Sequence, residues 1–301
     1  MSLPILVILY NRPDKIRQIV ESLNNIAATQ VFFFADGPKS QDDDFIRCCN
    51  ARACINLLST KHRAIKNFQT INLGCANSCL RAVDWFFSLV DCGLILEDDI
   101  ILTKSGYGQA EILSRNLIYD EQIFALSLSP FIRTTNETPF LSSYLNVWGW
   151  CTCRSKWLAF RAYWTKATIR TLGTDIIYLE NLRITHKIYW FFVLASIKSG
   201  WNCWDHPIQL YAWIENKKFL VLPFPTTLNI GFDQDGTTLK RPPDFVKELD
   251  LGDECILLNH NAIFHDDLRY DESCSKVVFN ISPASILRKA LKFFLILLQR
   301  P

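Results

Sequence analysis

The sequence predicts an α/β protein with a mainly parallel β-sheet. Short apolar runs of strand length alternate along the chain with longer segments in which apolar residues recur at helical spacing. Strands that alternate with helices are typical of parallel sheets with helices on their faces. Polar residues follow several of the apolar runs, and such sheets bind ligands beyond the carboxyl ends of their strands.

The first apolar run, residues 3–10, is unbroken, which indicates a strand buried on both faces. Asn11 is expected to cap the helix that follows, and Pro13 suits the first turn of that helix. A second apolar run covers residues 30–34. A turn signal closes it, and a second helix is expected from about residue 42 to residue 58.

Helical spacing is clearest after Gly74, where the apolar residues fall on one helix face. These residues are Cys75, Cys79, Ala82, Val83, Phe86, Phe87 and Val90. The further strands are expected at residues 68–72, 93–96, 124–129 and 219–223. Residues 177–199 are expected to form one helix or two.

The alternation breaks beyond residue 130, and residues 144–164 are rich in Trp and Tyr. The chain shows no Gly/Ser-rich linker and no internal repeat. We therefore expect residues 1–130 and 131–282 to be two halves of one domain, with an amphipathic helix at residues 283–301.

Composition narrows the class of protein. Hydrophobic residues make up 49% of the 301 residues and charged residues 21%, which is typical of a globular chain. The net charge is +2 without a long basic run, so nucleic acid is not an expected partner. The 11 cysteines form no Cys-x-x-Cys pair and the histidines are scattered. We therefore expect free cysteines in a reducing compartment, and no structural zinc site.

The stretch GLILEDDI places three consecutive carboxylates, Glu97, Asp98 and Asp99, at the end of an expected buried strand. Adjacent carboxylates repel each other, and burying them is costly unless a cation is present. Mg²⁺ and Mn²⁺ prefer oxygen ligands and bridge to substrate phosphates. The triplet therefore indicates a metal site. A polar turn after a strand is the alternative.

Asp36 follows the second expected strand, where it would accept a hydrogen bond from a base or a ribose. The alternative is a turn aspartate before Gly-Pro. Asn72 also follows an expected strand. The chain has no Walker A loop and no G-x-G-x-x-G, which disfavours P-loop enzymes and dinucleotide dehydrogenases. It also has no G-x-S-x-G elbow.

Two aromatic segments are candidates for sugar binding, because Trp faces stack on the apolar faces of sugars. One contains Trp148 and Trp150, for which core packing is the alternative. The other places Asp205 beside Trp201 and Trp204. A partly desolvated aspartate has a raised pKa and acts as a general base, whereas a helix cap is the alternative function for Asp205.

Four blocks of the sequence resemble glycosyltransferases of the GT-A fold, in particular a bacterial group related in pattern to N-acetylglucosaminyltransferase I. The blocks are PILVILYNRPDKIRQIVESL, NLGCANSCLRAVDWFF with GLILEDDI, VWGWCTCRSKW, and WNCWDHPIQLYAWIENKKFLVLPFPTTLNIGFDQDGTT. They occur in the family's order and cover most of residues 3–238. The acidic triplet, the WGW block and the WD…NIGF block are the most specific.

The resemblance implies roles for individual residues. Asp99, with Glu97, would hold Mn²⁺ or Mg²⁺, and Asp205 would be the catalytic carboxylate. The other implied sets are Arg12, Asp36, Asn72 and Asp98 for the nucleotide sugar, and Trp148, Trp150 and Trp204 for the acceptor. Relatives often carry Ala-Thr-His after NIGF, whereas this chain has Thr238 in place of the histidine.

The expected function is metal-dependent transfer of a sugar from a nucleoside-diphosphate donor, UDP-linked, to a hydroxyl of a surface glycan, with inversion. The first half would bind the donor, and the second half would bind a glycan or lipid-linked glycan acceptor. Two alternatives remain open. One is a sugar nucleotidyltransferase, although its Gly-rich loop after the first strand is missing, and the other is a non-catalytic glycan-binding module.

A cytoplasmic location is expected, because the first residues resemble a strand and not a signal peptide, and no apolar run reaches the ~18 residues of a membrane span. Residues 285–301 mix basic and apolar side chains. This segment is expected to contact the inner face of the membrane peripherally. A terminal helix packed on the domain is the alternative.

Overall fold

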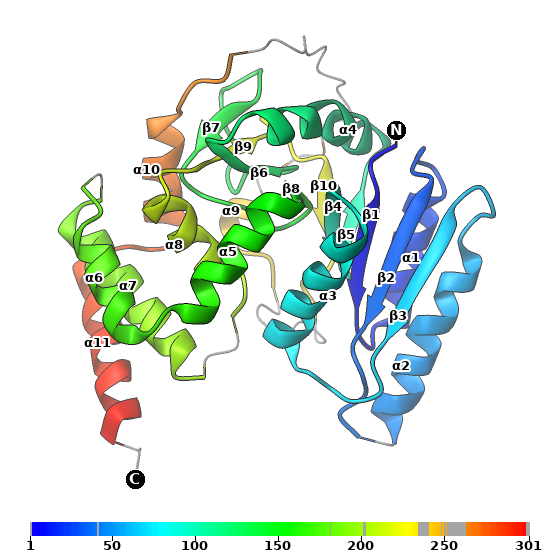
Figure 1. The fold of residues 1–301 in the computed structure, drawn as a ribbon, viewed down its shortest axis with the longest axis horizontal. Coiled ribbons are helices and arrows are strands. Elements are labelled where there is room, and N and C mark those ends of the chain that lie inside the picture. The colour runs from blue at the N-terminus through cyan, green and yellow to red at the C-terminus, as the bar shows by residue number, and fades with distance from the viewer. Residues whose placement is uncertain are drawn as a thin grey trace.

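The computed structural model describes residues 2–40, 42–180, 182–200, 203–233, 241–247, 249, 251 and 263–298, with residues 292–298 as backbone only. Its centre is an eight-stranded sheet in the order β3-β2-β1-β4-β8-β6-β9-β7, flanked by helices (Figure 1). The strands are β1 Ile5–Leu9, β2 Gln30–Ala35, β3 Arg63–Phe68, β4 Cys92–Glu97, β6 Ile123–Ser127, β7 Phe140–Ser142, β8 Trp150–Cys153 and β9 Lys218–Val221. The predicted α/β class with a mainly parallel sheet is confirmed.

Strands β3, β2, β1 and β4 are parallel neighbours. Strand β8 is antiparallel to both β4 and β6, and β9 is parallel to β6. Strand β7 is antiparallel to β9, so only β7 and β8 oppose the other strands of this sheet. In Figure 1 the carboxyl ends of β1, β2 and β3 point toward the bottom of the molecule.

The helices before the middle of the chain are α1 Pro13–Leu23, α2 Asp43–Ala53, α3 Cys75–Leu89 and α4 Lys104–Tyr119. The later ones are α5 Arg154–Lys166, α6 Ile169–Ile177, α7 Ile184–Lys198, α8 His206–Ile214, α9 Asp244–Lys247, α10 Leu268–Val277 and α11 Pro283–Leu298. A 3₁₀ helix, Cys54–Leu57, follows α2. A second, two-stranded sheet pairs β5 (Ile100–Leu102) with β10 (Thr227–Asn229).

Alternate side chains of β1 enter two hydrophobic cores, as the two-residue period of a strand requires. Val7 lies in the core covered by α1, α2 and α4, whereas Leu6 and Ile8 lie in the core covered by α3, α5, α7 and α8. All five residues of β1 are buried, which explains its unbroken apolar run.

The third strand was predicted at residues 68–72, and this prediction is wrong, because β3 is Arg63–Phe68. β3 is an edge strand that pairs only with β2 and is largely exposed, so it carries polar residues in place of an apolar run. Residues 177–199 contain the end of α6 and all of α7, so the two-helix option is the correct one.

Asn11 does not cap the first helix. The cap position is Arg12, without a side-chain capping bond, and the Asn11 side chain instead donates to Asp44 Oδ1 at 2.5 Å. Among the described helices, none combines the length and apolarity that crossing a bilayer requires.

Candidate active site

Arg12 and the acidic triplet meet at the carboxyl edge of the sheet. β1 and β4 are parallel neighbours, so the loop after β1 lies beside the residues that follow β4. The Arg12 guanidinium donates to Asp98 Oδ1 and, at 3.0 Å, to Asp99 Oδ2. The backbone N–H of Tyr10 donates to Asp98 Oδ2 at 3.3 Å. Asp98 is therefore held by groups of the chain itself.

Glu97 has a different environment from Asp98. Burial raises the pKa of Glu97, and the nearby charges of Asp99, Cys75, Asp98 and Asp205 raise it further. In the part of the chain that the structure describes, neither a hydrogen-bond donor nor a cationic side chain bonds to the Glu97 carboxylate. A carboxylate that is surrounded by like charge and lacks a partner fits a bound cation.

The donor set suits a hard divalent ion shared with a phosphate group. Mg²⁺ takes one or two carboxylates and completes its shell with water and substrate phosphate oxygens. Glu97 offers one of those carboxylates. Arg12 holds both Asp98 and Asp99, so Asp99 would offer its other oxygen. The triplet does not form a closed three-ligand cage among the described residues. A metal here would thus be completed by the substrate.

The NIGF segment packs directly on Asp99. The backbone N–H of Ile230 donates to the Asp99 carbonyl at 2.8 Å, which extends the pairing of β5 with β10. A Cβ on Gly231 would lie 2.2 Å from Asp99 Oδ2, so only glycine leaves room for that carboxylate. This contact links two of the blocks on which the sequence resemblance rests.

Lys15 is a site residue that the sequence analysis missed. Its side chain is 10% exposed, and its Nζ donates to the Ile230 carbonyl at 2.5 Å and to Asp233. Lys15 lies three residues after Arg12, so the two cations share one face of the first helical turn. The three-residue spacing of Arg12 and Lys15 could have indicated that Lys15 belongs to the site. Its acidic partner, Asp233, is distant in sequence, so the pairing itself could not be predicted.

Trp150 is not an acceptor-binding residue. It is 0% exposed and pairs with Ile95 of β4, so it offers no face to a sugar. Its ring lies 5.9 Å from that of Trp204, which is itself 5% exposed. The core alternative is therefore correct for Trp150, and the aromatic contact positions the segment that carries Asp205.

Trp148 lies closer to the surface than Trp150 does. Its ring meets that of Phe232 in an edge contact at 5.7 Å, beside the NIGF segment. Gly149 between the two tryptophans has φ +82° and would place a Cβ 2.6 Å from Thr227. This turn separates a buried tryptophan from a half-buried one.

Asp205 lies at the start of α8, but its side chain makes no capping bond. Its Oδ1 lies 3.1 Å from His206 Nδ1 and accepts from Cys203 Sγ at 2.9 Å. Burial alone raises the pKa of Asp205, but the His206 charge and these hydrogen bonds outweigh it and lower the pKa overall. The predicted raised pKa is therefore wrong.

Asp205 and Glu97 interact through their charges although they are distant in sequence. The charge of Asp205 is among those that raise the pKa of Glu97, and it also acts on Cys75 at the start of α3. The chain brings them together through β8, because Trp150 of β8 pairs with β4 and contacts Trp204.

Asp36 and Asn72 contact each other beside this site. Asp36 Oδ1 accepts from the backbone N–H groups of Gly37 and Leu73, both at 2.8 Å. The Asn72 amide donates to Asp36 Oδ2 at 3.2 Å. These bonds join the turn after β2, which carries Asp36, to the loop between β3 and α3, which carries Asn72, and burial raises the pKa of Asp36. Thr238 and Trp201 lie outside the described residues.

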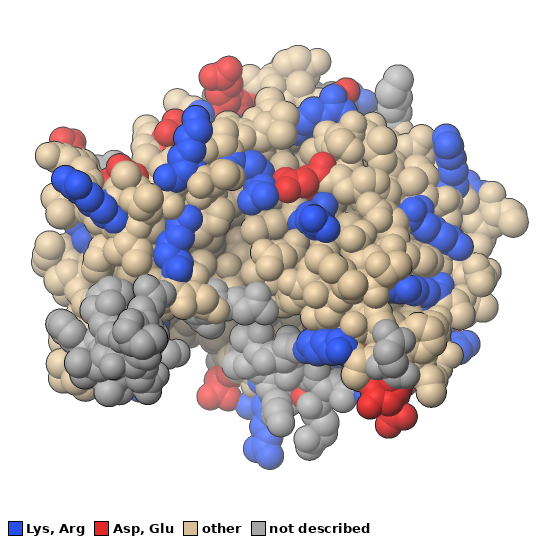
Figure 2. All heavy atoms as spheres, turned by 60° about the horizontal axis from the view of Figure 1, so that its bottom comes forward, with Lys and Arg blue, Asp and Glu red and all other residues tan. Residues whose placement is uncertain are grey.

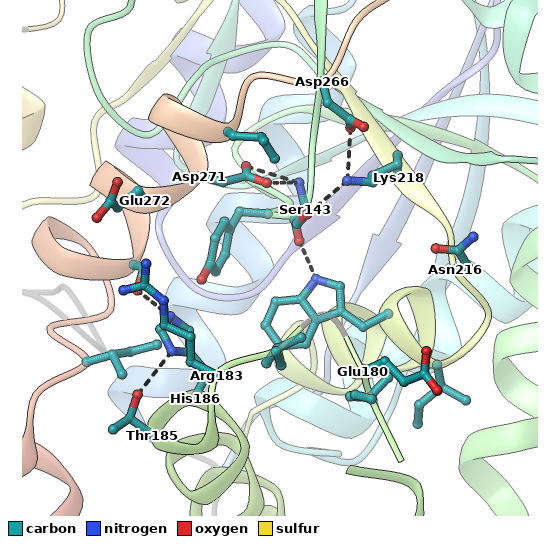
Figure 3. Close-up of a pocket in the computed structure, with 18 of the residues that line it drawn as sticks. Ser143, Glu180, Arg183, Thr185, His186, Asn216, Lys218, Asp266, Asp271 and Glu272 are labelled. Atoms are coloured by element: carbon teal, nitrogen blue, oxygen red, sulfur yellow. Dashed lines mark hydrogen bonds and ion pairs between the residues drawn. The ribbon is translucent and has the colours of Figure 1, made fainter. Parts of the chain in front are cut away.

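A cavity of about 890 Å³ lies at the opposite edge of the sheet (Figure 3). Lys218 begins β9 and pairs with Asp266 at 2.9 Å, and the Trp213 indole donates to the Ser143 carbonyl at 2.7 Å. None of the carboxylates of the triplet lines this cavity. The candidate active site therefore does not coincide with it.

Figure 2 turns the bottom of Figure 1 forward and so shows the face onto which the carboxyl ends of β1 and β2 open. Lys and Arg side chains are more widespread on this face than Asp and Glu side chains. Such a face favours the approach of an anionic substrate.

No protein-family model matches this sequence, and no curated protein matches it. Among solved structures, the chain is similar to the apo form of mouse xyloside xylosyltransferase 1, with a TM-score of 0.40 and 10% identity. The match covers 74% of this chain and 85% of that chain. A likeness at this level carries no argument about function, which must be argued from the residues.

Proposed function

We propose that this chain is a glycosyltransferase that moves a sugar from a nucleoside-diphosphate donor, UDP-linked, to a hydroxyl of a surface glycan. The observation that carries the proposal is the meeting of Arg12 with the acidic triplet at the carboxyl edge of one sheet, together with the charge of Asp205 that acts on Glu97. Parallel sheets bind ligands at this edge. The sequence resemblance supports the same reading.

The donor would lie against the ends of β1, β2 and β4. Arg12 and Lys15 place two cations beside the carboxylates, where a diphosphate brings negative charge. Asp36 and Asn72 would contact the nucleoside, because they follow β2 and β3, the strands next to β1 in the sheet, and bond to each other. Asp98 would orient Arg12.

Glu97 and Asp99 would hold Mn²⁺ or Mg²⁺ together with the diphosphate. Bound there, the cation stabilises the negative charge that develops on the leaving diphosphate. Asp205 would accept the proton of the attacking acceptor hydroxyl. Asp205 is ionised at neutral pH and so can accept the proton, although its lowered pKa makes it a weaker base. Attack opposite the leaving group gives an inverted product.

The acceptor would approach over Trp148, which is half-buried beside the NIGF segment, whereas Trp204 is buried against Trp150 and would only position the segment that carries Asp205. A glycan or a lipid-linked glycan presents hydroxyls and apolar sugar faces of the kind that such aromatic rings bind. If the acceptor is lipid-linked, the basic and apolar C-terminal helix would bind the membrane surface on which the acceptor lies.

The test is turnover of a panel of nucleotide sugars by the full chain with Mn²⁺, with free UDP as the product. Asp99→Asn should abolish turnover while the circular dichroism spectrum is unchanged, and EDTA should inhibit the parent protein reversibly. Asp14→Asn, an exposed aspartate in the first turn of α1, is the matched control. Release of pyrophosphate would identify a nucleotidyltransferase instead. Unchanged turnover in Asp99→Asn would remove the metal assignment.

A further inference from the structure

Three side chains of different chemistry converge just before α8. Cys203 Sγ lies 2.9 Å from Asp205 Oδ1 and 3.1 Å from His206 Nδ1, and the Asp205 oxygen lies 3.1 Å from the same Nδ1. The three atoms thus form a small triangle. Among the described residues, this is the group of three His, Cys, Asp or Glu side chains whose ligand atoms all lie close enough to share one metal ion.

The triangle differs from a nucleophile–histidine–carboxylate relay. A relay uses one ring nitrogen for the nucleophile and the other for the carboxylate. Here the thiol and the carboxylate both meet Nδ1, which carries either one hydrogen or one lone pair and so cannot serve both partners well. A cation at the centre of the triangle would satisfy all three atoms at once.

We propose that Cys203, Asp205 and His206 form a zinc-binding site with a fourth position open to solvent. Sulfur, imidazole and carboxylate ligands together suit Zn²⁺, whereas Mg²⁺ and Mn²⁺ prefer oxygen ligands alone. Zn–S bonds of about 2.3 Å and Zn–N or Zn–O bonds of about 2.0–2.1 Å place tetrahedral ligands about 3.3–3.6 Å apart. The edges of the triangle therefore need to lengthen by about 0.2–0.7 Å.

The surroundings hold the ligands in place yet leave the ion accessible. The His206 ring packs 5.2 Å from the Trp190 ring, and the neighbouring Trp204 is buried against Trp150. The side chains of His206 and Asp205 are 22% and 35% exposed, so an ion can enter from solvent. Zinc would occupy the Asp205 oxygen that the proposed transfer uses, so we expect zinc to inhibit transfer. This consequence rests on the proposed function, whereas zinc binding does not.

Cobalt spectroscopy tests the site without any enzymatic assay. The full-length protein is freed of metal with EDTA, dialysed and titrated with Co²⁺. We expect the near-ultraviolet charge-transfer band from the thiolate and the visible bands of tetrahedral Co²⁺ to saturate at one equivalent, because Co²⁺ bound to carboxylates alone gives no thiolate band. Equimolar Zn²⁺ should remove these bands, because Zn²⁺ takes the same ligands.

Variants separate this site from the other thiols and from the acidic triplet. Cys203→Ser should lose the charge-transfer band, and His206→Ala should weaken Zn²⁺ binding by more than ~10–100-fold, the cost of losing even an outer-shell partner. Cys49→Ser, which removes an exposed thiol of α2, and Asp99→Asn should keep the band. The proposal is overturned if the parent protein shows no thiolate band at saturating Co²⁺, or if Cys203→Ser retains the band. Neither result would bear on sugar transfer.

Discussion

Asp205 is subject to opposing influences on its charge. Burial disfavours its ionised form, whereas His206 and the Cys203 thiol favour it, and the second influence is the larger. Burial alone predicts the opposite direction for the pKa. The adjacent histidine was visible in the sequence, but the direction in which its ring points was not.

Replacing Asp205 with asparagine keeps its shape and removes the base. We expect Asp205→Asn to lower kcat by ~10²–10⁴-fold, the usual contribution of a general base, with donor affinity nearly unchanged. Rapid-quench kinetics and calorimetric donor binding measure the two effects separately.

His206→Ala is the comparison for this prediction, because histidine is the neighbouring group able to accept a proton. Nuclear magnetic resonance of the product should show an inverted anomeric centre. A retained configuration, or a rate loss confined to the His206 variant, would contradict the assignment of Asp205.

Glu97 gives the site a pH dependence whose direction follows from its raised pKa. The folded-state pKa lies above the ordinary value of 4.5, so the proton on Glu97 stabilises the fold at low pH. That contribution is lost as pH rises through the folded-state pKa. Mn²⁺ takes the place of the proton, so metal binding should strengthen over the same interval.

Thermal unfolding at a series of pH values tests this expectation. The increase in Tm caused by Mn²⁺ should grow as the pH rises above 4.5 toward neutrality. Glu97→Gln should flatten that dependence, whereas Glu121→Gln, an exposed glutamate, should leave it unchanged. An equal Mn²⁺ effect at every pH in the parent protein would exclude Glu97 as the titrating ligand.

Short elements carry the site, and they were the hardest to predict. The long apolar runs of β1, β2 and β4 and the helical spacing of α3 were clear, because burial on both faces fixes residue type at nearly every position. The three-residue strands β5 and β10 have no such pattern, because a strand of that length is specified by its distant partner. The sequence therefore revealed Asp99 but not the segment that packs on it.

That packing makes Gly231 a sensitive position. In Gly231→Ala the new methyl group would meet the Asp99 carboxylate, which must move because the neighbouring atoms are close. We expect at least a tenfold higher Mn²⁺ requirement for turnover, which corresponds to ~1.4 kcal/mol. Activity measured against Mn²⁺ concentration shows the shift.

Gly108→Ala is the matched substitution for Gly231→Ala. Gly108 lies in α4, and a Cβ there would meet no atom within 4 Å. Alanine favours helix by ~0.5–1 kcal/mol over glycine, so this variant should be slightly more stable and keep the parent Mn²⁺ dependence. Equal Mn²⁺ requirements in the two variants would show that the Gly231 contact does not position Asp99.

At the scale of the whole molecule, the last part of the chain combines positively charged residues with exposed apolar side chains. After Glu272 the sequence contains no further acidic residue, although it contains several Lys and Arg residues. On α11, Leu287 is 62% exposed and Leu291 is 56% exposed, whereas Ile286 packs on the core. The helix is thus docked on the protein by one side and presents apolar residues on another.

We therefore expect the protein to float with anionic vesicles and not with neutral ones, because basic and apolar groups act together at such a surface. The double substitution Leu287→Glu with Leu291→Glu should abolish flotation. Exposed leucines elsewhere supply the control, Leu57→Glu with Leu158→Glu. Flotation that is the same for both double variants would exclude α11 as the membrane contact.

The place of β8 between β4 and β6 has a consequence for how the chain is made. Synthesis releases β4 and β6 before β8, so each waits with an unpaired edge until residues 150–153 have emerged. Asp99 can be packed only later, after the segment around Gly231 has been synthesised. Exposed strand edges pair with other chains, so slow or interrupted translation in this interval would favour aggregation. The yield of active protein should therefore depend on the rate at which the ribosome delivers the middle of the chain.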